Sequence, residues 1–251
     1  MLRFLLILSL LTSFLISAQP VKVAIIIDDI GYRKTDVQAL SLPGNISFAV
    51  LPHTPYGKRL ALQAKAGNND VIIHIPMEAK NGKKLGPGAL TSTMNEASIR
   101  QSLTNAFTEI PFALGISNHM GSKLTELYQP MAWTMQFLNE RNLIFIDSMT
   151  TSDSVAEKTA LNFGVPSLQR NIFLDNKKEY TYIRKQFEQL IRDAKRYDNV
   201  VAIAHPHPET ITALRKLLPL LEKNNIALVP ISALLPNKTI QHKQQLNTDD
   251  E

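Results

Sequence analysis

The stretch AIIIDDIG, residues 24–31, decides how the fold is interpreted. Four apolar residues lead directly into two adjacent carboxylates, Asp28 and Asp29. A run of apolar, β-branched residues is typical of a strand that is buried on both faces of a parallel sheet. Two like charges at its end indicate either an ordinary helix cap or turn, or a site that receives a positively charged partner.

Seven further apolar segments follow, and helical patterns separate them. The strands predicted from these runs cover residues 21–29, 46–52, 70–77, 113–119, 143–148, 167–174, 199–207 and 226–232. Helical spacing is clearest over residues 95–110, 177–198 and 208–225, with Asn95 as N-cap of the first and Pro219 expected to kink or end the third. Strands that alternate with helices along the chain predict an α/β fold, either a (β/α) barrel or an open doubly wound sheet.

The N-terminus has the pattern of a secretory signal. One Arg precedes an apolar run over residues 4–15, and Ser17 and Ala18 supply the small residues of a cleavage site. The run is shorter than the roughly 20 residues of a membrane span. We predict a signal peptide over residues 1–18 and an exported protein, periplasmic or extracellular, with no stable membrane span. The alternative is an uncleaved anchor.

The composition is that of one ordinary globular domain. Of 251 residues, 44% are apolar and 20% are charged, which is enough to bury a full core. The net charge is +5, and the basic residues are scattered. We therefore expect no nucleic-acid partner, whereas attraction to an anionic polymer such as a cell-wall glycan is compatible with this charge. The folded domain is expected over residues 19–236, followed by a polar, disordered tail over residues 237–251.

The ionisable residues gather where the predicted strands end. Of six histidines, five lie at or just after a strand end, namely His53, His74, His119, His205 and His207. Asp28, Asp29 and Asp147 occupy similar positions. A single strand-end Asp more often caps a helix, and a single His more often has a structural role. In a β/α barrel, however, the strand ends form one face on which distant residues converge, so their joint placement favours a metal or polar catalytic site.

The residue types narrow the chemistry of that site. The chain contains no cysteine, so a metal has to be held by His, Asp and Glu. Neutral imidazole with one or two carboxylates is a usual ligand set for zinc. Zinc lowers the pKa of a water ligand to about 7, and a second carboxylate beside it can act as general base. The sequence has no G-x-S-x-G elbow, phosphate-binding loop or dinucleotide fingerprint that would predict a different chemistry.

Five motifs together resemble the divergent polysaccharide deacetylases, namely IIIDDIG, HIPME, SNHMGS, IFIDS and IAHPH. That family is related to the carbohydrate esterases that include the chitooligosaccharide deacetylases. The resemblance covers residues 21–232 and implies a single-domain, distorted (β/α) barrel with seven or eight parallel strands. It also implies that Asp28 is the catalytic base, that Asp29 and His74 are metal ligands, and that the metal is a divalent ion such as Zn²⁺.

One motif departs from the family pattern. Related deacetylases place a second histidine four residues after the first on this strand, and here Glu78 stands in that position. Either Glu78 takes the ligand role or another residue does, and we favour His119. The resemblance implies that His205 is the general acid. Asp147 is expected either to orient His205 or to contact the sugar.

The function implied is a secreted, metal-dependent hydrolase that removes N-acetyl groups from an amino-sugar polysaccharide of the cell envelope, such as a peptidoglycan-like glycan. One alternative is a catalytically inactive glycan- or cell-wall-binding protein of the same fold. Another is a hydrolase of the same architecture that acts on a different amide or ester. The glycine-rich loop over residues 80–93 either shapes substrate access, which we favour, or is a plain surface loop. The candidate substrate contacts are Glu78, Asn118, Asp147, His53 and His207.

Overall fold

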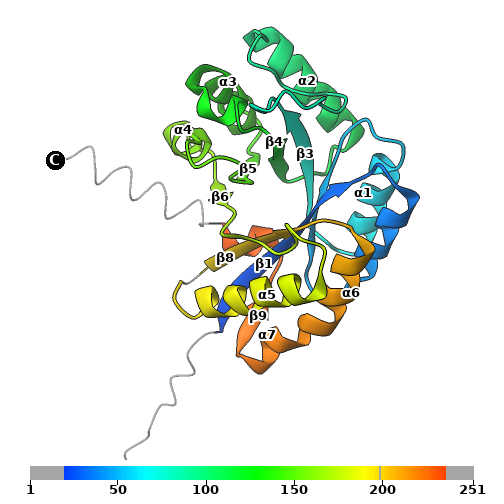
Figure 1. Ribbon diagram of the computed structural model, residues 1–251. Coiled ribbons are helices and arrows are strands. Elements are labelled where there is room, and N and C mark those ends of the chain that lie inside the picture. The colour runs from blue at the N-terminus through cyan, green and yellow to red at the C-terminus, as the bar shows by residue number, and fades with distance from the viewer. Residues whose placement is uncertain (1–19, 198, 236–251) are drawn as a thin grey trace, which may run out of the picture.

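The structure, a computed structural model, describes residues 20–197 and 199–235 (Figure 1). The predicted signal peptide and the predicted tail lie outside these residues. Within the described ranges, no helix is long and apolar enough to cross a membrane. Strands and helices alternate through this part of the chain and form a single domain.

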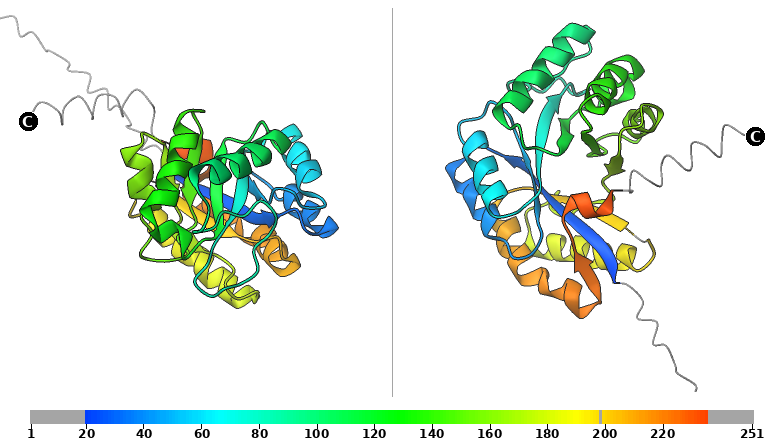
Figure 2. Two further views of the ribbon diagram at one scale, coloured as in Figure 1. Left: turned by 90° about the horizontal axis from the view of Figure 1, so that it is seen from above. Right: turned by 180° about the vertical axis from the view of Figure 1, so that it is seen from behind.

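In the described residues, one parallel sheet of nine strands forms the centre of the fold. Neighbours follow the order β6-β5-β4-β3-β2-β1-β8-β7, and β9 pairs with β1. The sheet curls into a half-barrel, which confirms the predicted distorted (β/α) barrel (Figures 1 and 2). The strands are β1 (Val21–Ile30), β2 (Ser47–Val50), β3 (Val71–Met77), β4 (Gly115–Met120), β5 (Ile144–Asp147), β6 (Ser167–Gln169), β7 (Ile172–Phe173), β8 (Asn199–Ala204) and β9 (Ile226–Leu228).

The predicted strand over residues 167–174 differs from the expectation, because Arg170 and Asn171 interrupt it. Its first half, β6, pairs with β5 at one end of the sheet, whereas β7 pairs with β8 at the other. Between them, Arg170 N donates to Asp147 O and Asn171 N donates to Val201 O, both at 2.9 Å. The segment therefore crosses between the two edges of the curled sheet, and the sheet has nine strands where seven or eight were expected.

Helices fill most connections between strands and lie on the outer side of the curled sheet (Figures 1 and 2). Asn95 caps α2 as predicted, and its side chain accepts a hydrogen bond from Ser98 N at 2.9 Å. The third predicted helix breaks at Pro219, which begins a separate helix. The helices are α1 (Gly57–Ala66), α2 (Glu96–Glu109), α3 (Tyr128–Asn139), α4 (Ala156–Asn162), α5 (Tyr180–Ala194), α6 (Pro208–Leu217) and α7 (Pro219–Lys223), with short 3-10 helices η1 (Lys34–Ser41), η2 (Leu124–Glu126) and η3 (Ile231–Leu234).

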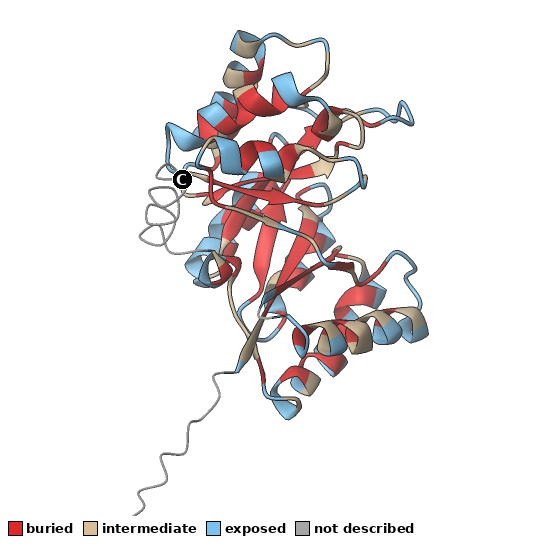
Figure 3. Cartoon of the chain, turned by 90° about the vertical axis from the view of Figure 1, so that its left-hand side faces the viewer, coloured by how far each residue is buried: buried red, intermediate tan, exposed pale blue. Residues whose placement is uncertain are grey.

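Successive residues of a strand face two different apolar layers, because side chains alternate across the sheet. In β1, Val23, Ile25 and Ile27 pack in the outer layer, which also contains the helices. Ala24 and Ile26 pack in the inner layer, inside the half-barrel, together with η3. Figure 3 shows the buried strands at the centre and the helices with their outer faces exposed. The position of a residue along its strand therefore decides which layer its side chain enters.

The end of β1 breaks this alternation. Its register with β2 shifts between Ile27 and Ile30, and Asp29 has a φ of 60°. Ile27 and Ile30 both pack in the outer layer, so the two residues between them, Asp28 and Asp29, stand where simple alternation would place one. This irregularity lets two adjacent carboxylates face the inside of the half-barrel from one strand.

Candidate metal centre

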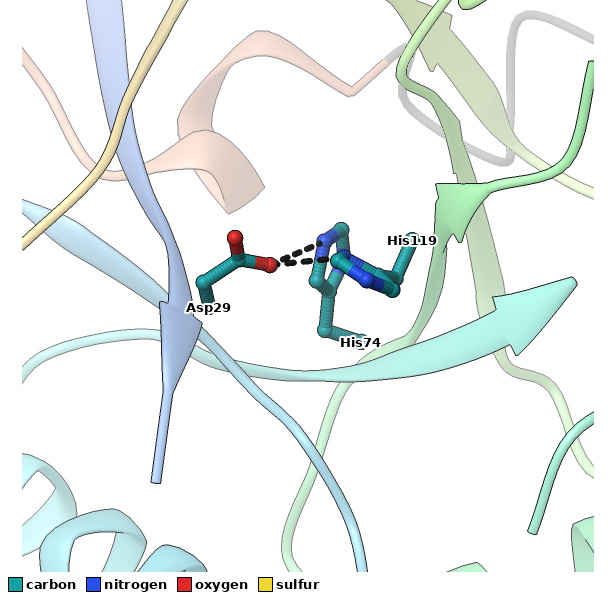
Figure 4. A group of neighbouring side chains, drawn as sticks. All are labelled: Asp29, His74 and His119. Carbon is teal, nitrogen blue, oxygen red and sulfur yellow. Dashed lines mark ion pairs between the residues drawn. The ribbon is translucent and has the colours of Figure 1, made fainter. Parts of the chain in front are cut away.

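Three predicted site residues meet inside the half-barrel, one from each of three strands. Asp29 comes from β1, His74 from β3 and His119 from β4, and one ligand atom of each lies within 4.8 Å of the others. His119 Nδ1 is 2.7 Å from Asp29 Oδ1, and His74 Nε2 is 3.4 Å from the same oxygen (Figure 4). One carboxylate and two imidazoles that converge in this way suit a divalent ion such as zinc. We call these three residues the metal cradle.

The surroundings of His74 fix which of its nitrogens faces the cradle. His74 is buried and lies opposite Ser117 in the pairing of β3 with β4. Its Nδ1 is 2.7 Å from Ser117 Oγ, which leaves Nε2 directed at Asp29. A hydrogen bond to the second ring nitrogen holds a metal-binding imidazole in orientation. Ser117 therefore supports the ligand role predicted for His74.

The Asp29 oxygen that faces both rings is buried and accepts no well-aligned hydrogen bond from the residues that the structure describes. Burial alone would raise the pKa of Asp29, but its contacts with His119 and His74 hold that pKa far below the usual range of a carboxyl group. The oxygen is thus anionic and lies within 3.4 Å of two imidazole nitrogens. This combination fits a cation bound between the three side chains.

Asp28 lies directly beside the metal cradle. It is buried, and its Oδ2 is 3.5 Å from His74 Nε2. Within the described part of the chain, its Oδ1 accepts no hydrogen bond. Burial raises the pKa of Asp28, although the nearby His74 and His205 oppose the shift. A carboxylate with a raised pKa binds a proton more readily, so its position and its environment suit a general base.

His205 is oriented by Asp175, a residue that the sequence analysis missed. Its Nδ1 is 2.9 Å from Asp175 Oδ1, and its backbone N–H donates to Asp175 Oδ2 at 2.8 Å. Its Nε2 lies 4.0 Å from Asp29 Oδ2, at the edge of the cradle. Burial alone would lower the pKa of His205, but the hydrogen bond and charge of Asp175, together with Asp29 and Asp28, raise it to about 9. Asp175 directly follows the predicted strand over residues 167–174, and the same strand-end signal that drew attention to Asp28 would have found it.

Of the two roles expected for Asp147, the orientation of His205 is wrong, because Asp175 occupies that position. Asp147 is buried and instead accepts hydrogen bonds from Met149 N at 2.8 Å and Ser154 Oγ at 2.6 Å. Both of its oxygens are therefore used to hold the loop between β5 and α4.

Glu78 is not a member of the metal cradle. Its Oε1 accepts a hydrogen bond from Lys123 Nζ, and its Oε2 accepts one from Ser92 N, both at 2.6 Å. These two partners lower the pKa of Glu78 to about 2. The carboxylate links the glycine-rich loop over residues 80–93, called the strap below, to the turn after β4. Of the two candidates for the third ligand, the structure brings His119 to Asp29 and His74.

Asn118 connects the ends of two neighbouring strands. It is fully buried, its Nδ2 donates to Met120 O, and its Oδ1 accepts from Ser148 N, both at 2.8 Å. Met120 has a φ of 57°, a conformation that is uncommon for a residue with a side chain. Asn118 therefore stabilises the tight turn that directly follows His119.

The two remaining candidates differ in their distance from the cradle. The ring of His207 lies beside that of His205, with 6.0 Å between the centroids. The ring of His53 instead pairs with Glu109 at the end of α2, with 2.7 Å between Nδ1 and Oε2. The structure thus brings His207 to the proton-donor side of the site and directs His53 toward α2.

Known proteins provide an independent comparison. Residues 25–235 match the family model described as divergent polysaccharide deacetylase. The uncharacterized protein YibQ of Escherichia coli K12 is 38% identical over 215 residues, which cover 85% of this chain and 67% of that protein.

Solved structures share the fold at lower identity. The uncharacterized protein ATU2773 from Agrobacterium tumefaciens C58 has a TM-score of 0.81 and 21% identity, over 87% of this chain and 90% of that one. The catalytic domain of the peptidoglycan N-acetylglucosamine deacetylase from Eubacterium rectale ATCC 33656 has a TM-score of 0.52 and 17% identity, over 86% and 93%. With the family model matched from the first strand to the last 3-10 helix, the chain belongs to the divergent polysaccharide deacetylase family.

Proposed function

We propose that this protein is an exported, metal-dependent hydrolase that removes N-acetyl groups from an amino-sugar polysaccharide of the cell envelope. The observation that carries the proposal is the convergence of the metal cradle with Asp28 and His205 inside the half-barrel. Family membership supports the reaction class, and the peptidoglycan deacetylase among the structural neighbours supports the substrate class by analogy. The signal-like N-terminus supports export.

The metal cradle is the part of the chain that would hold the ion. When bound, a divalent ion such as zinc supplies a Lewis acid that polarises the acetyl carbonyl and lowers the pKa of water. Ser117 holds the ring of His74, Asn118 stabilises the turn after His119, and the irregular end of β1 directs Asp29 inward. All three ligands are therefore fixed by the sheet and need no rearrangement of a loop.

Asp28 and His205 divide the two proton transfers of amide hydrolysis. Asp28 takes a proton from the attacking water, and its raised pKa makes it a stronger base than an exposed carboxylate. Asp175 stabilises the charged form of His205, which suits this ring to donate a proton to the departing amine nitrogen. The acid and the base come from different strand ends, so they can reach different atoms of the substrate.

Acetate release tests the proposal directly. Zinc-loaded protein is expected to release acetate from an acetylated amino-sugar polymer. The Asp28→Asn variant is nearly isosteric and should lose at least about 100-fold in rate, which is the range of a general base, while it keeps its zinc.

Two results would contradict the proposal. Glycan binding with stoichiometric zinc and no acetate release would identify the inactive glycan-binding alternative. Hydrolysis of other amides or esters, with none of the acetylated polymer, would contradict the proposed substrate but not the proposed metal-dependent hydrolysis.

A further inference from the structure

A cleft of about 620 Å³ opens beside the metal cradle. His119 and Met120 at the end of β4 form one of its walls, and Tyr32 and strap residues 84–87 form the others. His119 belongs to the cradle and to the cleft at once. A polymer bound in the cleft would therefore continue directly into the reacting centre.

The wall that carries Tyr32 is held rigidly. Asp36 is fully buried, and its Oδ2 accepts hydrogen bonds from Gly31 N at 3.1 Å and Arg33 N at 3.0 Å, on either side of Tyr32. Gly31 has a φ of 139°, and a Cβ there would lie 2.3 Å from Thr54 Oγ1, so only glycine fits this turn. The Tyr32 side chain remains 47% exposed. The backbone on either side of Tyr32 is thus held in place, and its partly exposed ring lies three residues after Asp29.

The strap wall is held as well. Leu90 pairs with Met77 in an isolated parallel bridge and its carbonyl accepts from Glu78 N at 3.0 Å, while Gly88 O accepts from Ser102 Oγ at 2.7 Å. Gly86 approaches Tyr32 so closely that a Cβ there would lie 2.7 Å from the tyrosine hydroxyl oxygen. Both walls of the cleft are therefore positioned by contacts within the chain.

The charge of the cleft is contributed by Lys84, which is exposed at its rim. In the described part of the chain Lys84 has no ion-pair partner, whereas Lys80 of the same strap pairs with Glu126 and Lys123 pairs with Glu78, each at 2.6 Å. The residues that line the cleft include no carboxylate. A free ammonium group beside an aromatic ring suits a ligand that has both a flat apolar face and a negative charge.

We propose that this cleft holds the sugar units next to the reacting one, and that Tyr32 and Lys84 select an amino-sugar chain whose units carry a carboxylate. Tyr32 supplies the surface for a sugar ring, and Lys84 binds the carboxylate of that unit. The orientation of the chain rests on the proposed function, but binding in the cleft does not require turnover.

The test compares two tetrasaccharides of equal length. One contains only N-acetylglucosamine, and in the other every second unit carries a lactyl-ether carboxylate. Their dissociation constants are measured by calorimetry with the zinc-loaded full chain in an Asp28→Asn background, so that neither is consumed. The carboxylate probe should bind more tightly, and Lys84→Gln should weaken it about fivefold, in the range of one exposed ion pair, without changing the neutral probe.

Matched variants separate the two contacts. Lys83→Gln removes the neighbouring strap charge outside the cleft wall and should change neither constant, whereas Tyr32→Ala should weaken both probes about tenfold. The advantage of the carboxylate probe should also shrink in 0.5 M salt. Equal binding of the two probes, or equal effects of Lys83→Gln and Lys84→Gln, would overturn the carboxylate selection. Unchanged binding by Tyr32→Ala would overturn the cleft itself.

The same probes distinguish this inference from the proposed function. Probe binding that depends on Tyr32 and Lys84, with no acetate release by the protein that retains Asp28, would support the cleft and contradict the deacetylase. Acetate release that is unchanged by substitution of Tyr32 and of Lys84 would support the deacetylase and contradict the cleft.

Discussion

Two strands of this protein end alike in sequence and differently in space. In β1 an isoleucine run leads to Asp28, and in β5 the similar run IFI leads to Asp147. Asp28 continues the alternation of Ala24 and Ile26 and faces the inside of the half-barrel. Asp147 continues the alternation of Phe145, which packs in the outer layer, and its oxygens bind the loop before α4.

The difference shows what turns a strand-end carboxylate into a candidate site residue. The first requirement is its place in the alternation, which sends a side chain to the inner or the outer layer. The second is local geometry, because the irregular end of β1 adds Asp29 to the inner side beside Asp28. In a parallel sheet with both faces covered, a strand end can serve either a catalytic centre or a structural loop.

Substitution by alanine should affect zinc binding at Asp29 and stability at Asp147. Asp29→Ala removes a direct ligand and should preserve the fold. Substitution of a residue that only hydrogen-bonds a ligand lowers metal affinity by up to roughly 100-fold, so the loss of zinc affinity here should be larger. Asp147→Ala should keep its zinc and lose about 2 kcal/mol of unfolding free energy, because it leaves two partly buried donors without their acceptor. Elemental analysis and urea unfolding of both variants measure the two effects.

The comparison would fail if Asp147→Ala lost its zinc while it remained folded, since Asp147 would then act on the cradle. It would also fail if Asp29→Ala kept stoichiometric zinc. Double substitution provides a further check, because two residues that serve separate regions should have additive effects on stability.

The fold and the positions of the strand ends could be predicted from the sequence. The face of the sheet on which each strand-end side chain lies could not. Strands buried on both sides are apolar at every position, so the alternation that separates Asp28 from Asp147 leaves no mark in the residue types. The division of the predicted strand at Arg170 was equally hidden, because its two halves pair with opposite edges of the curled sheet, which come near each other only in the folded structure.

The candidate site was predictable to the extent that it uses strand-end residues. Asp29, His74 and His119 were expected to meet, and the structure brings them together. Asp175 follows an apolar segment in the same way but was not predicted, because it lies outside the five family motifs, between IFIDS and IAHPH. Glu78 shows the opposite case. It occupies a motif position but forms an ion pair with Lys123, which no local sequence pattern reveals.

Asp175 extends the comparison to a third strand-end carboxylate, one whose effect depends on pH. The pKa of His205 is raised to about 9, above its ordinary value of about 6.5, so this interaction stabilises the fold fully below pH 6.5 and is lost as pH rises through 9. In metal-free protein, the unfolding free energy should therefore fall by on the order of 3 kcal/mol between these values. Asp175→Asn should flatten this part of the curve, as measured by urea unfolding at several pH values.

His205→Gln is the matched control, because it removes the titrating ring and should give the same flat curve. A wild-type curve that is already flat between pH 6.5 and 9 would mean that Asp175 orients His205 without stabilising its charge. In that case the acid role would need a different source of the proton.

The smallest effect is expected at Glu78, where the comparison is with His119 on the neighbouring strand end. Glu78→Gln should keep stoichiometric zinc. Its unfolding free energy should fall by less than about 1 kcal/mol, because the ion pair between Glu78 and Lys123 is partly exposed. Because the pKa of Glu78 is lowered to about 2, that contribution is present above about pH 4.5 and disappears as pH falls toward 2. Elemental analysis and unfolding at pH 7 and pH 3 measure both expectations.

Two control variants test the assignment of the third ligand. His119→Gln should lose its zinc. Lys123→Met, which removes the partner of Glu78 but leaves Glu78 in place, should keep its zinc and lose as little unfolding free energy as Glu78→Gln. If Glu78→Gln loses zinc instead, the carboxylate must leave Lys123 to reach the metal, and the third ligand would be Glu78.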